Sequence, residues 1–334
     1  MHVDTDILDA LRAGGFVAPG VAPSLRRLTG GVSSDVFRLQ TPTGPVCVKR
    51  ALAKLRVAAT WEASVDRSHS EVEWLRTARP LVGEAVPQVL FEDRARSLFV
   101  MNFYDPATHA VWKSDLAAGR VDTAFARQVG ALLVKVHSGT AGRAEVAARF
   151  QTSKLFEELR IAPFLRHAAA THPDLGERLL ALADRTAEAR GALVHGDVSP
   201  KNILCGPSGP VLLDAECAWY GDPAFDLAFC SAHLLLKCVW QPAHTNGYLA
   251  SFAALHQAYL GGVDWEPAAT LEARAAELTA ATLLARVDGK SPADYLQTEA
   301  DRGFVRATAR ELVAGTPTTL AGLAAVWAAR RRDS

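Results

Sequence analysis

The residues that could do chemistry are concentrated in one polar stretch, from His195 to Asn202 (HGDVSPKN), which Asp214 follows after an apolar run. Residues 203–204 and 211–213 predict two short strands joined by a Gly- and Pro-containing turn. Antiparallel pairing would place the start of the first strand beside the end of the second. Because Asn202 precedes that start and Asp214 follows that end, we expect two oxygen ligands side by side, as a hard cation such as Mg²⁺ requires. Asp197 lies in the preceding loop, near enough to face a substrate hydroxyl.

This pattern resembles the active-site loop of a known enzyme family. HGDVSPKN followed by Asp214 is similar to the HxD-xxxx-N loop of kinase-like phosphotransferases, and GDPAFDLA at 221–228 resembles the aminoglycoside phosphotransferase superfamily. Asp214-Ala-Glu216 is similar to the DxE motif of 5-methylthioribose kinases, and stretches at 56–67 and 218–226 resemble the same branch. The likeness covers roughly residues 28–295, judged from the motifs.

The resemblance implies an α+β, bilobal, protein-kinase-like fold. A small N-terminal lobe with an antiparallel sheet is expected at 1–103, and a larger, mostly helical C-terminal lobe at 104–334. The implied activity is an ATP- and Mg²⁺-dependent phosphotransferase with an alcohol group as acceptor. Asp197 is then the catalytic residue, and Asn202, Asp214 and, by resemblance, Glu216 hold the metal. His195 and Asp226 are expected to support the catalytic loop.

The N-terminal lobe should bind the nucleotide. A loop with Gly30, Gly31, Ser33 and Ser34 lies between strand-like runs, where backbone N–H groups could contact phosphates. Lys49 ends the apolar strand 46–48 and matches the family lysine that contacts the α- and β-phosphates. Its expected ion-pair partner is Glu71 on the next helix, with Glu73 as the alternative. The segment that joins the lobes, with Met101 and Phe103, should bind the adenine through its backbone.

The acceptor is less well defined by the sequence. Expected contributors are the side chains of Trp219, Tyr220, Arg286, Asp288 and Lys290. Methylthioribose kinases have an adjacent arginine pair where this chain has Arg286 and Lys290, and they usually lack the asparagine at Asn202. From residue 227 onward, ten Asp+Glu face ten Lys+Arg, which is no carboxylate excess for a polycationic ligand. We therefore expect a small hydroxylated substrate, a sugar or a similar metabolite.

Other functions remain as alternatives. One is an aminoglycoside or other antibiotic O-phosphotransferase, and another is a nucleotide-binding pseudokinase that serves as a scaffold. A protein kinase is disfavoured because only eight residues separate Asp214 from Asp222, which leaves no room for a peptide-docking activation segment. A homodimer is suggested only by some relatives.

Composition restricts the function classes further. The 334 residues are enough for about two domains. Lys+Arg and Asp+Glu are equal at 36 each, which argues against a strongly basic nucleic-acid or membrane-surface binder. Five cysteines without a CxxC pair do not indicate a disulfide framework. Since the chain has no secretory signal pattern at its start and no apolar run of ~20 residues, we expect a cytoplasmic protein without a membrane partner.

Periodicity predicts the elements that must position these groups. Helices are expected at 5–13, 67–78, 125–136, 155–170 and 175–189, and a buried helix from about Leu227 that includes His233, Cys238 and Trp240. Strands are expected at 36–39, 46–49, 88–91 and 97–101. Lys201 is expected to be exposed to solvent.

Overall fold

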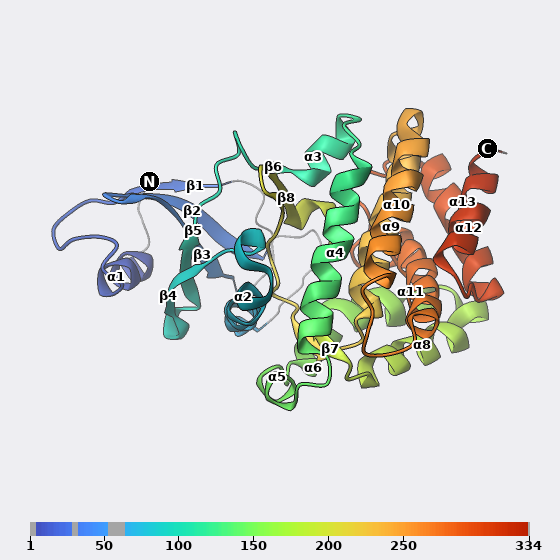
Figure 1. The fold of residues 1–334 in the computed structure, drawn as a ribbon, viewed down its shortest axis with the longest axis horizontal. Coiled ribbons are helices and arrows are strands. Elements are labelled where there is room, and N and C mark those ends of the chain that lie inside the picture. Colours follow the sequence, from blue (N-terminus) through green and yellow to red (C-terminus); the bar gives the residue numbers. More distant parts are fainter. Residues whose placement is uncertain (1–4, 29–32, 53–63, 333–334) are drawn as a thin grey trace.

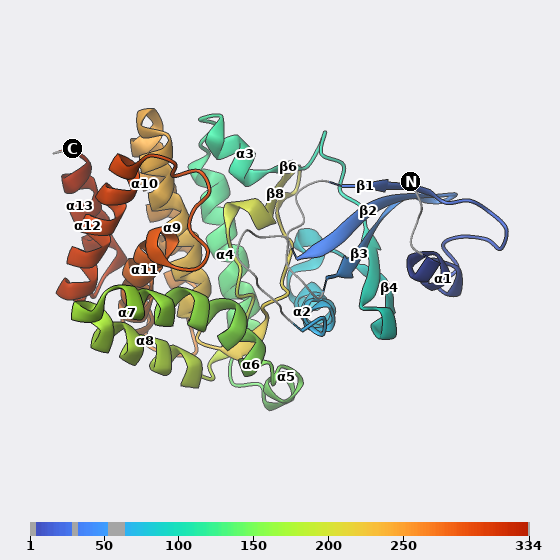
Figure 2. The same ribbon diagram turned by 180° about the vertical axis from the view of Figure 1, so that it is seen from behind.

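The N-terminal lobe is built on a five-stranded antiparallel sheet in the order β1-β2-β3-β5-β4. The computed structural model describes residues 5–28, 33–52 and 64–332. The strands are β1 (Ser24–Arg27), β2 (Ser34–Thr41), β3 (Gly44–Ala51), β4 (Val89–Asp93) and β5 (Leu98–Asn102). Figures 1 and 2 show this sheet at one end of the molecule and the helices of the C-terminal lobe at the other.

Alternation along β3 decides which way its lysine points. Helix α1 (Thr5–Ala13) packs on one face of the sheet, in an apolar cluster that includes Val46 and Val48. Cys47, between them, belongs instead to the main core with Val72 of α2 (Arg67–Val82). Because successive side chains of a strand point to opposite faces, Lys49 lies on the α2 face with Cys47.

The C-terminal lobe is mostly helical and has α9 at its centre. Almost every side chain of α9 is buried, as predicted for the helix near Leu227. The helices are α3 (Trp112–Ala117), α4 (Thr123–Thr140), α5 (Ala144–Arg149), α6 (Ser153–Phe156), α7 (His167–Thr171), α8 (Gly176–Glu188), α9 (Ala224–Trp240), α10 (Thr245–Leu260), α11 (Ala268–Asp288), α12 (Glu299–Gly315) and α13 (Leu320–Arg332). Short 3₁₀ turns lie at Gly83–Ala85, Arg94–Arg96, Pro173–Leu175, Pro200–Asn202 and Pro242–His244.

The helix expected at 155–170 is not a single α-helix. It divides into α6, a π-helical segment from Glu157 to Arg166, and α7. Pro163 lies inside the π-helical segment and has no N–H to donate to a regular ladder. π-Helical turns are rare and often occur at functional sites. This one carries Arg160, which contacts the catalytic loop.

Short strands hold the polar stretch in place. Strands β8 (Ile203–Gly206) and β9 (Gly209–Leu212) form the expected hairpin, with Ile203 paired to Leu212. β7 (Ala192–Val194), before the stretch, pairs with β10 (Trp219–Gly221), and β6 (Ala110–Val111) pairs with β8. Neither β6 nor β10 was predicted, since two or three residues are too few to show a period.

The bilobal kinase-like fold class is thus confirmed. The lobe boundary at residue 103 stays a prediction; the chain leaves β5 at Asn102 and enters β6 at Ala110. Among the helices that the structure describes, none has the length and apolar character needed to cross a bilayer.

Candidate active site

The loop between β7 and β8 is fixed by one buried carboxylate. Asp226, in the first turn of α9, accepts hydrogen bonds from the backbone N of His195 at 2.7 Å and of Gly196 at 2.8 Å. Gly196 has a φ of +79°, and a Cβ there would lie 2.6 Å from the carbonyl oxygen of Cys217. Only glycine therefore fits this position without strain. The loop backbone is held from both sides, directly before Asp197.

His195 has the contacts of a structural residue. Its Nε2 lies 3.0 Å from the carbonyl oxygen of Leu213, and the backbone N–H of Asp197 donates to its Nδ1 at 3.2 Å. This pattern requires the neutral ring with its proton on Nε2. Burial agrees, because it lowers the pKa of His195. The ring also meets Trp74 edge-on, with 4.8 Å between the centroids.

Asp197 is nearly buried, with 5% of its surface exposed, and it faces two cations. Its Oδ2 lies 2.9 Å from Arg160 and 3.2 Å from Nζ of Lys201. Arg160 also donates to the carbonyl oxygen of Gly196 at 2.6 Å. Burial alone would raise the pKa of Asp197, but attraction to Arg160 and Lys201 outweighs it, and the pKa falls below its ordinary value. The carboxylate is therefore ionised at neutral pH.

Asn202 and Asp214 offer the oxygen atoms that a metal would need. Nδ2 of Asn202 donates to the carbonyl oxygen of Asp197 at 3.0 Å, which leaves its Oδ1 as an acceptor. Oδ1 of Asp214 contacts Lys49, and Oδ2 has no hydrogen-bond partner in the described part of the chain. Asp214 has a φ of +69°, a conformation uncommon outside glycine that often marks functional sites. An amide and a carboxylate oxygen fit Mg²⁺, which keeps several ligands from water and phosphate.

Lys49 connects the two lobes. Its Nζ lies 2.6 Å from Oε2 of Glu71 on α2 and also contacts Asp214 of the C-terminal lobe. Of the two expected partners, the structure pairs Lys49 with Glu71, whereas Glu73 lies 3.1 Å from Arg76 on the surface. Burial lowers the pKa of Lys49, but Asp214 and Glu71 raise it more, so the ammonium stays charged.

Glu216 pairs with an arginine that the motif analysis did not assign. Oε2 of Glu216 accepts from Nε of Arg67 at 3.2 Å. Arg67 is fully buried and also donates to the carbonyl oxygens of Ser33, at 2.6 Å, and Leu52. The pair therefore joins the Asp214–Glu216 turn to the ends of β2 and β3. Arg67 is the last residue of the stretch 56–67 that resembles the methylthioribose kinase branch. This resemblance was the only feature of the sequence that pointed to Arg67.

These features agree with comparisons to known proteins. A model described as the phosphotransferase enzyme family (APH) matches residues 24–237. The chain belongs to this family. Methylthioribose kinase 2 of Oryza sativa subsp. japonica is 26% identical over 253 residues, which are 67% of this chain and 59% of that protein. The match thus spans about three fifths of the length of that relative.

Solved structures support the fold. An amicoumacin kinase in complex with AMP-PNP, Ca²⁺ and Ami has a TM-score of 0.59 at 14% identity, with 96% of both chains covered. An aminoglycoside phosphotransferase from Alicyclobacillus acidocaldarius has a TM-score of 0.53 at 15% identity, covering 100% of this chain and 96% of the other. The prediction of the family is confirmed.

Part of the predicted nucleotide site, namely Gly30 and Gly31, lies outside the described residues. Ser33 and Ser34 are buried at the start of β2, and the carbonyl oxygen of Ser33 accepts from the N–H of Leu52 at 2.9 Å. Met101 is buried on β5. Phe103 is half-buried, with the guanidinium of Arg38 5.4 Å from its ring centroid. Their roles toward adenine stay predictions.

The five expected acceptor residues are not brought together. Trp219 is buried and stacks on Phe156 at 4.3 Å between centroids. Tyr220 is buried too, and its hydroxyl donates to a backbone carbonyl oxygen of α4 at 3.1 Å. Asp288 pairs with Arg306 of α12. These contacts engage the three side chains in the packing of the protein itself.

The two remaining acceptor candidates differ in position. Lys290 is exposed. Arg286 lies against the ring of Phe164, as does Arg160, which contacts Asp197. Sequence reasoning missed Arg160, because an arginine within a helical stripe has no distinguishing pattern.

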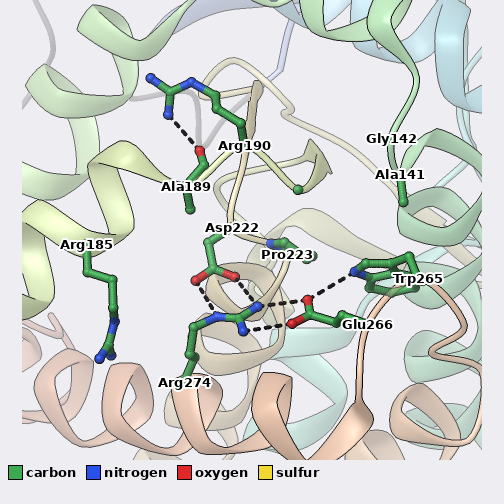
Figure 3. A pocket seen from close by; sticks show the side chains of 11 residues that line it. Ala141, Gly142, Arg185, Ala189, Arg190, Asp222, Pro223, Trp265, Glu266 and Arg274 are labelled. Carbon is green, nitrogen blue, oxygen red and sulfur yellow. Dashed lines mark hydrogen bonds and ion pairs between the residues drawn. The ribbon is translucent and has the colours of Figure 1, made fainter.

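A surface hollow of about 510 Å³ lies apart from this centre, and neither Asp197 nor Asp214 lines it. Figure 3 shows Arg274 of α11 between Asp222 and Glu266 in this hollow. Nε of Arg274 lies 2.9 Å from Asp222, whose Oδ1 accepts from the N–H of Ala224 in the first turn of α9. The arginine thus anchors the start of the helix that carries Asp226.

Proposed function

We propose that the chain is an ATP- and Mg²⁺-dependent small-molecule kinase that transfers the γ-phosphoryl group to a hydroxyl of a sugar or sugar-like metabolite. The contact of Lys49 with both Glu71 and Asp214 carries this proposal. It brings the phosphate-binding lysine of one lobe to the metal-binding carboxylate of the other, as phosphoryl transfer between the lobes requires. The relatives named methylthioribose kinase support a sugar-like acceptor.

Each side chain has a separate task in this proposal. Lys49 binds phosphate oxygens of ATP, with Glu71 orienting its ammonium. Asn202 and Asp214 hold Mg²⁺, which when bound would neutralise charge on the phosphates. The pKa of Asp214 is about 2: burial opposes ionisation, but Lys49 and Lys201 outweigh it. The carboxylate is therefore ready to bind a cation over the whole neutral range.

Asp197 acts on the acceptor. It accepts a hydrogen bond from the substrate hydroxyl, orients the oxygen toward the phosphorus and receives the proton as the new bond forms. With its lowered pKa it is a weak base, so orientation is its larger contribution. This suits phosphoryl transfer, whose loose transition state depends mostly on alignment and charge stabilisation.

An acceptor screen tests the proposal. ATP consumption is measured with pentoses, hexoses, polyols, amino alcohols and aminoglycosides. We expect turnover with at least one sugar or polyol and a loss of at least ~100-fold in Asp197→Asn. The matched control is Asp9→Asn, which alters only an exposed carboxylate 3.8 Å from Arg12.

Two outcomes of the screen would replace the proposal. Turnover confined to aminoglycosides would assign the chain to the antibiotic-modifying alternative. Stabilisation by Mg-ATP without any turnover would favour the pseudokinase scaffold. A homodimer stays a prediction.

A further inference from the structure

A group of cationic and aromatic side chains lies beside Asp197 in the C-terminal lobe. We call it the cationic cluster and define it by Arg160, Lys201, Lys237, Arg286, Trp240 and Tyr295. Its members come from the π-helical segment, the catalytic loop, α9, α11 and the segment after α11. The formal net charge of the whole chain is zero and gives no sign of this local excess of basic side chains.

The cluster is continuous with the catalytic carboxylate. Arg160 lies 2.9 Å from Asp197, and its Cζ is 5.8 Å from the ring centroid of Phe164. Cζ of Arg286 is 5.9 Å from the same ring. The two guanidinium groups therefore lie against one aromatic side chain, and one of them, Arg160, pairs with Asp197.

Lys237 is the most unusual member. Only 1% of its surface is exposed, and its Nζ has no hydrogen bond or ion pair with the described residues. Its Nζ lies between rings, 3.5 Å from the centroid of Tyr295 and 4.4 Å from that of Trp240. A buried ammonium without a carboxylate partner is costly, and ring faces repay only part of that cost, so burial lowers the pKa of Lys237 to about 6. A ligand that brings a negative charge would favour the protonated amine and pair with it.

The other groups near Lys237 do not supply that charge. Lys113 of α3 adds a further cation 5.3 Å from the Tyr295 ring. The carboxylate of Asp294 is 78% exposed and lies 3.3 Å from Lys113. His233, one turn before Lys237 on α9, has its pKa lowered by burial, then by Arg286 and Lys237. A neutral imidazole there gives no compensation.

Unsatisfied hydrogen-bond donors lie near the unpaired amine of Lys237. Nε of Arg286 and the hydroxyl of Tyr295 are buried without a hydrogen-bond partner. The other end of Arg286 donates to the backbone carbonyl oxygen of Ser291 and contacts no carboxylate in the described chain. Buried donors of this kind are normally paired, so a bound acceptor group is the simplest completion of the site.

From this cluster we infer that the acceptor is a hydroxy compound that also carries an anionic group, either a carboxylate or a phosphate. Lys237 and Arg286 bind the anionic group, while Asp197 accepts a hydrogen bond from the hydroxyl. The inference rests on the proposed kinase function and narrows its substrate. A cationic acceptor such as an aminoglycoside would be repelled by Arg286 and would give Lys237 no negative partner.

The experiment compares acceptors that differ by one charged group. ATP consumption is measured with glycerol against glycerate, ribose against ribose 5-phosphate, and ethanolamine as a cation. We expect kcat/KM to be at least tenfold higher for the anionic member of a pair. Glycerate and phosphate esters distinguish the two sources of charge. Equal or better turnover of neutral or cationic acceptors would overturn the inference and leave the kinase function intact.

Variants test whether Lys237 is responsible for the preference for anionic acceptors. Lys237→Met keeps most of the length of the buried side chain without its amine, so the fold should tolerate it. We expect it to raise KM for the anionic acceptor at least tenfold with little change in kcat. The control is Lys154→Met, whose ammonium is on a 92% exposed side chain. An unchanged KM in Lys237→Met would refute the role of this residue.

A binding readout separates this inference from the proposed function. Thermal stabilisation by glycerate and by inorganic phosphate is measured with AMP-PNP saturating the nucleotide site. Stabilisation that is lost in Lys237→Met supports an anion site even if no acceptor is phosphorylated, in which case the kinase proposal alone fails. No stabilisation by either probe, together with turnover of neutral sugars, would eliminate the anion site.

Discussion

Replacement of Asp226 by asparagine tests the support of the catalytic loop. The carboxylate accepts from the backbone N–H groups of His195 and Gly196, and Nε2 of His137 lies 3.2 Å away. An amide would leave one of these donors without an acceptor, at ~1–3 kcal/mol, and weaken the other two by ~1 kcal/mol each. Because removal of a buried charge offsets part of this, we expect a net loss of about 3 kcal/mol.

The loss is measurable by urea unfolding, followed by tryptophan fluorescence at pH 7. Wild type and Asp226→Asn are compared with Asp9→Asn, whose exposed pair contributes ~0–1 kcal/mol. We also expect kcat to fall more than KM changes, since the displaced backbone carries Asp197. A destabilisation below ~1 kcal/mol relative to the control would refute the view that this carboxylate holds the loop.

Three further changes address other contacts. Gly196→Ala should lower the free energy of unfolding by at least ~2 kcal/mol, because the position has a positive φ and a Cβ there would contact Cys217. The control Gly303→Ala should raise it by ~0.5–1 kcal/mol, because Gly303 lies in α12 with open space around it. Urea unfolding measures both. Arg67→Met should cost about 3 kcal/mol in the same assay, because buried carbonyl oxygens lose charged donors. Burial lowers the pKa of Lys237 to about 6. In the unfolded chain this amine keeps its proton up to ~pH 10, whereas in the folded chain it has lost the proton above about pH 6. The free energy of unfolding of the wild type should therefore rise with pH from about 6 to about 10. Urea unfolding at several pH values should show that Lys237→Met lacks this rise; an equal slope in both proteins would contradict it.

Local sequence was sufficient where partners are close along the chain. The hairpin that brings Asn202 beside Asp214 spans only a few residues, so turn composition and apolar runs predicted it. The same holds for β3 and for the helix that carries Glu71, because strand alternation and helical periodicity are local properties. The family resemblance then placed Asp197 and Lys49 in one site.

Sequence reasoning failed where side chains meet across the fold. Trp219 and Tyr220 were expected near the acceptor, but β10 pairs with β7 and turns both into the core. A strand of two or three residues, or a single turn of helix, is too short for its sequence to show which face is buried. The division of the helix at 155–170 was missed for a similar reason, since π-helical and α-helical turns have nearly the same apolar spacing.

The sequence by itself was enough to predict the candidate site, because its motif residues are grouped along the chain and their spacing sets their geometry. Only the tertiary structure decided what surrounds that centre. Arg67, Arg160 and Lys237 are basic residues in helices, and their neighbours along the chain do not reveal their partners. Their burial and contacts follow from packing between segments as much as 149 residues apart, as for Arg67 and Glu216. The charge state of a side chain in a protein site depends on such long-range packing, because burial sets the free-energy cost of a charged group without a partner.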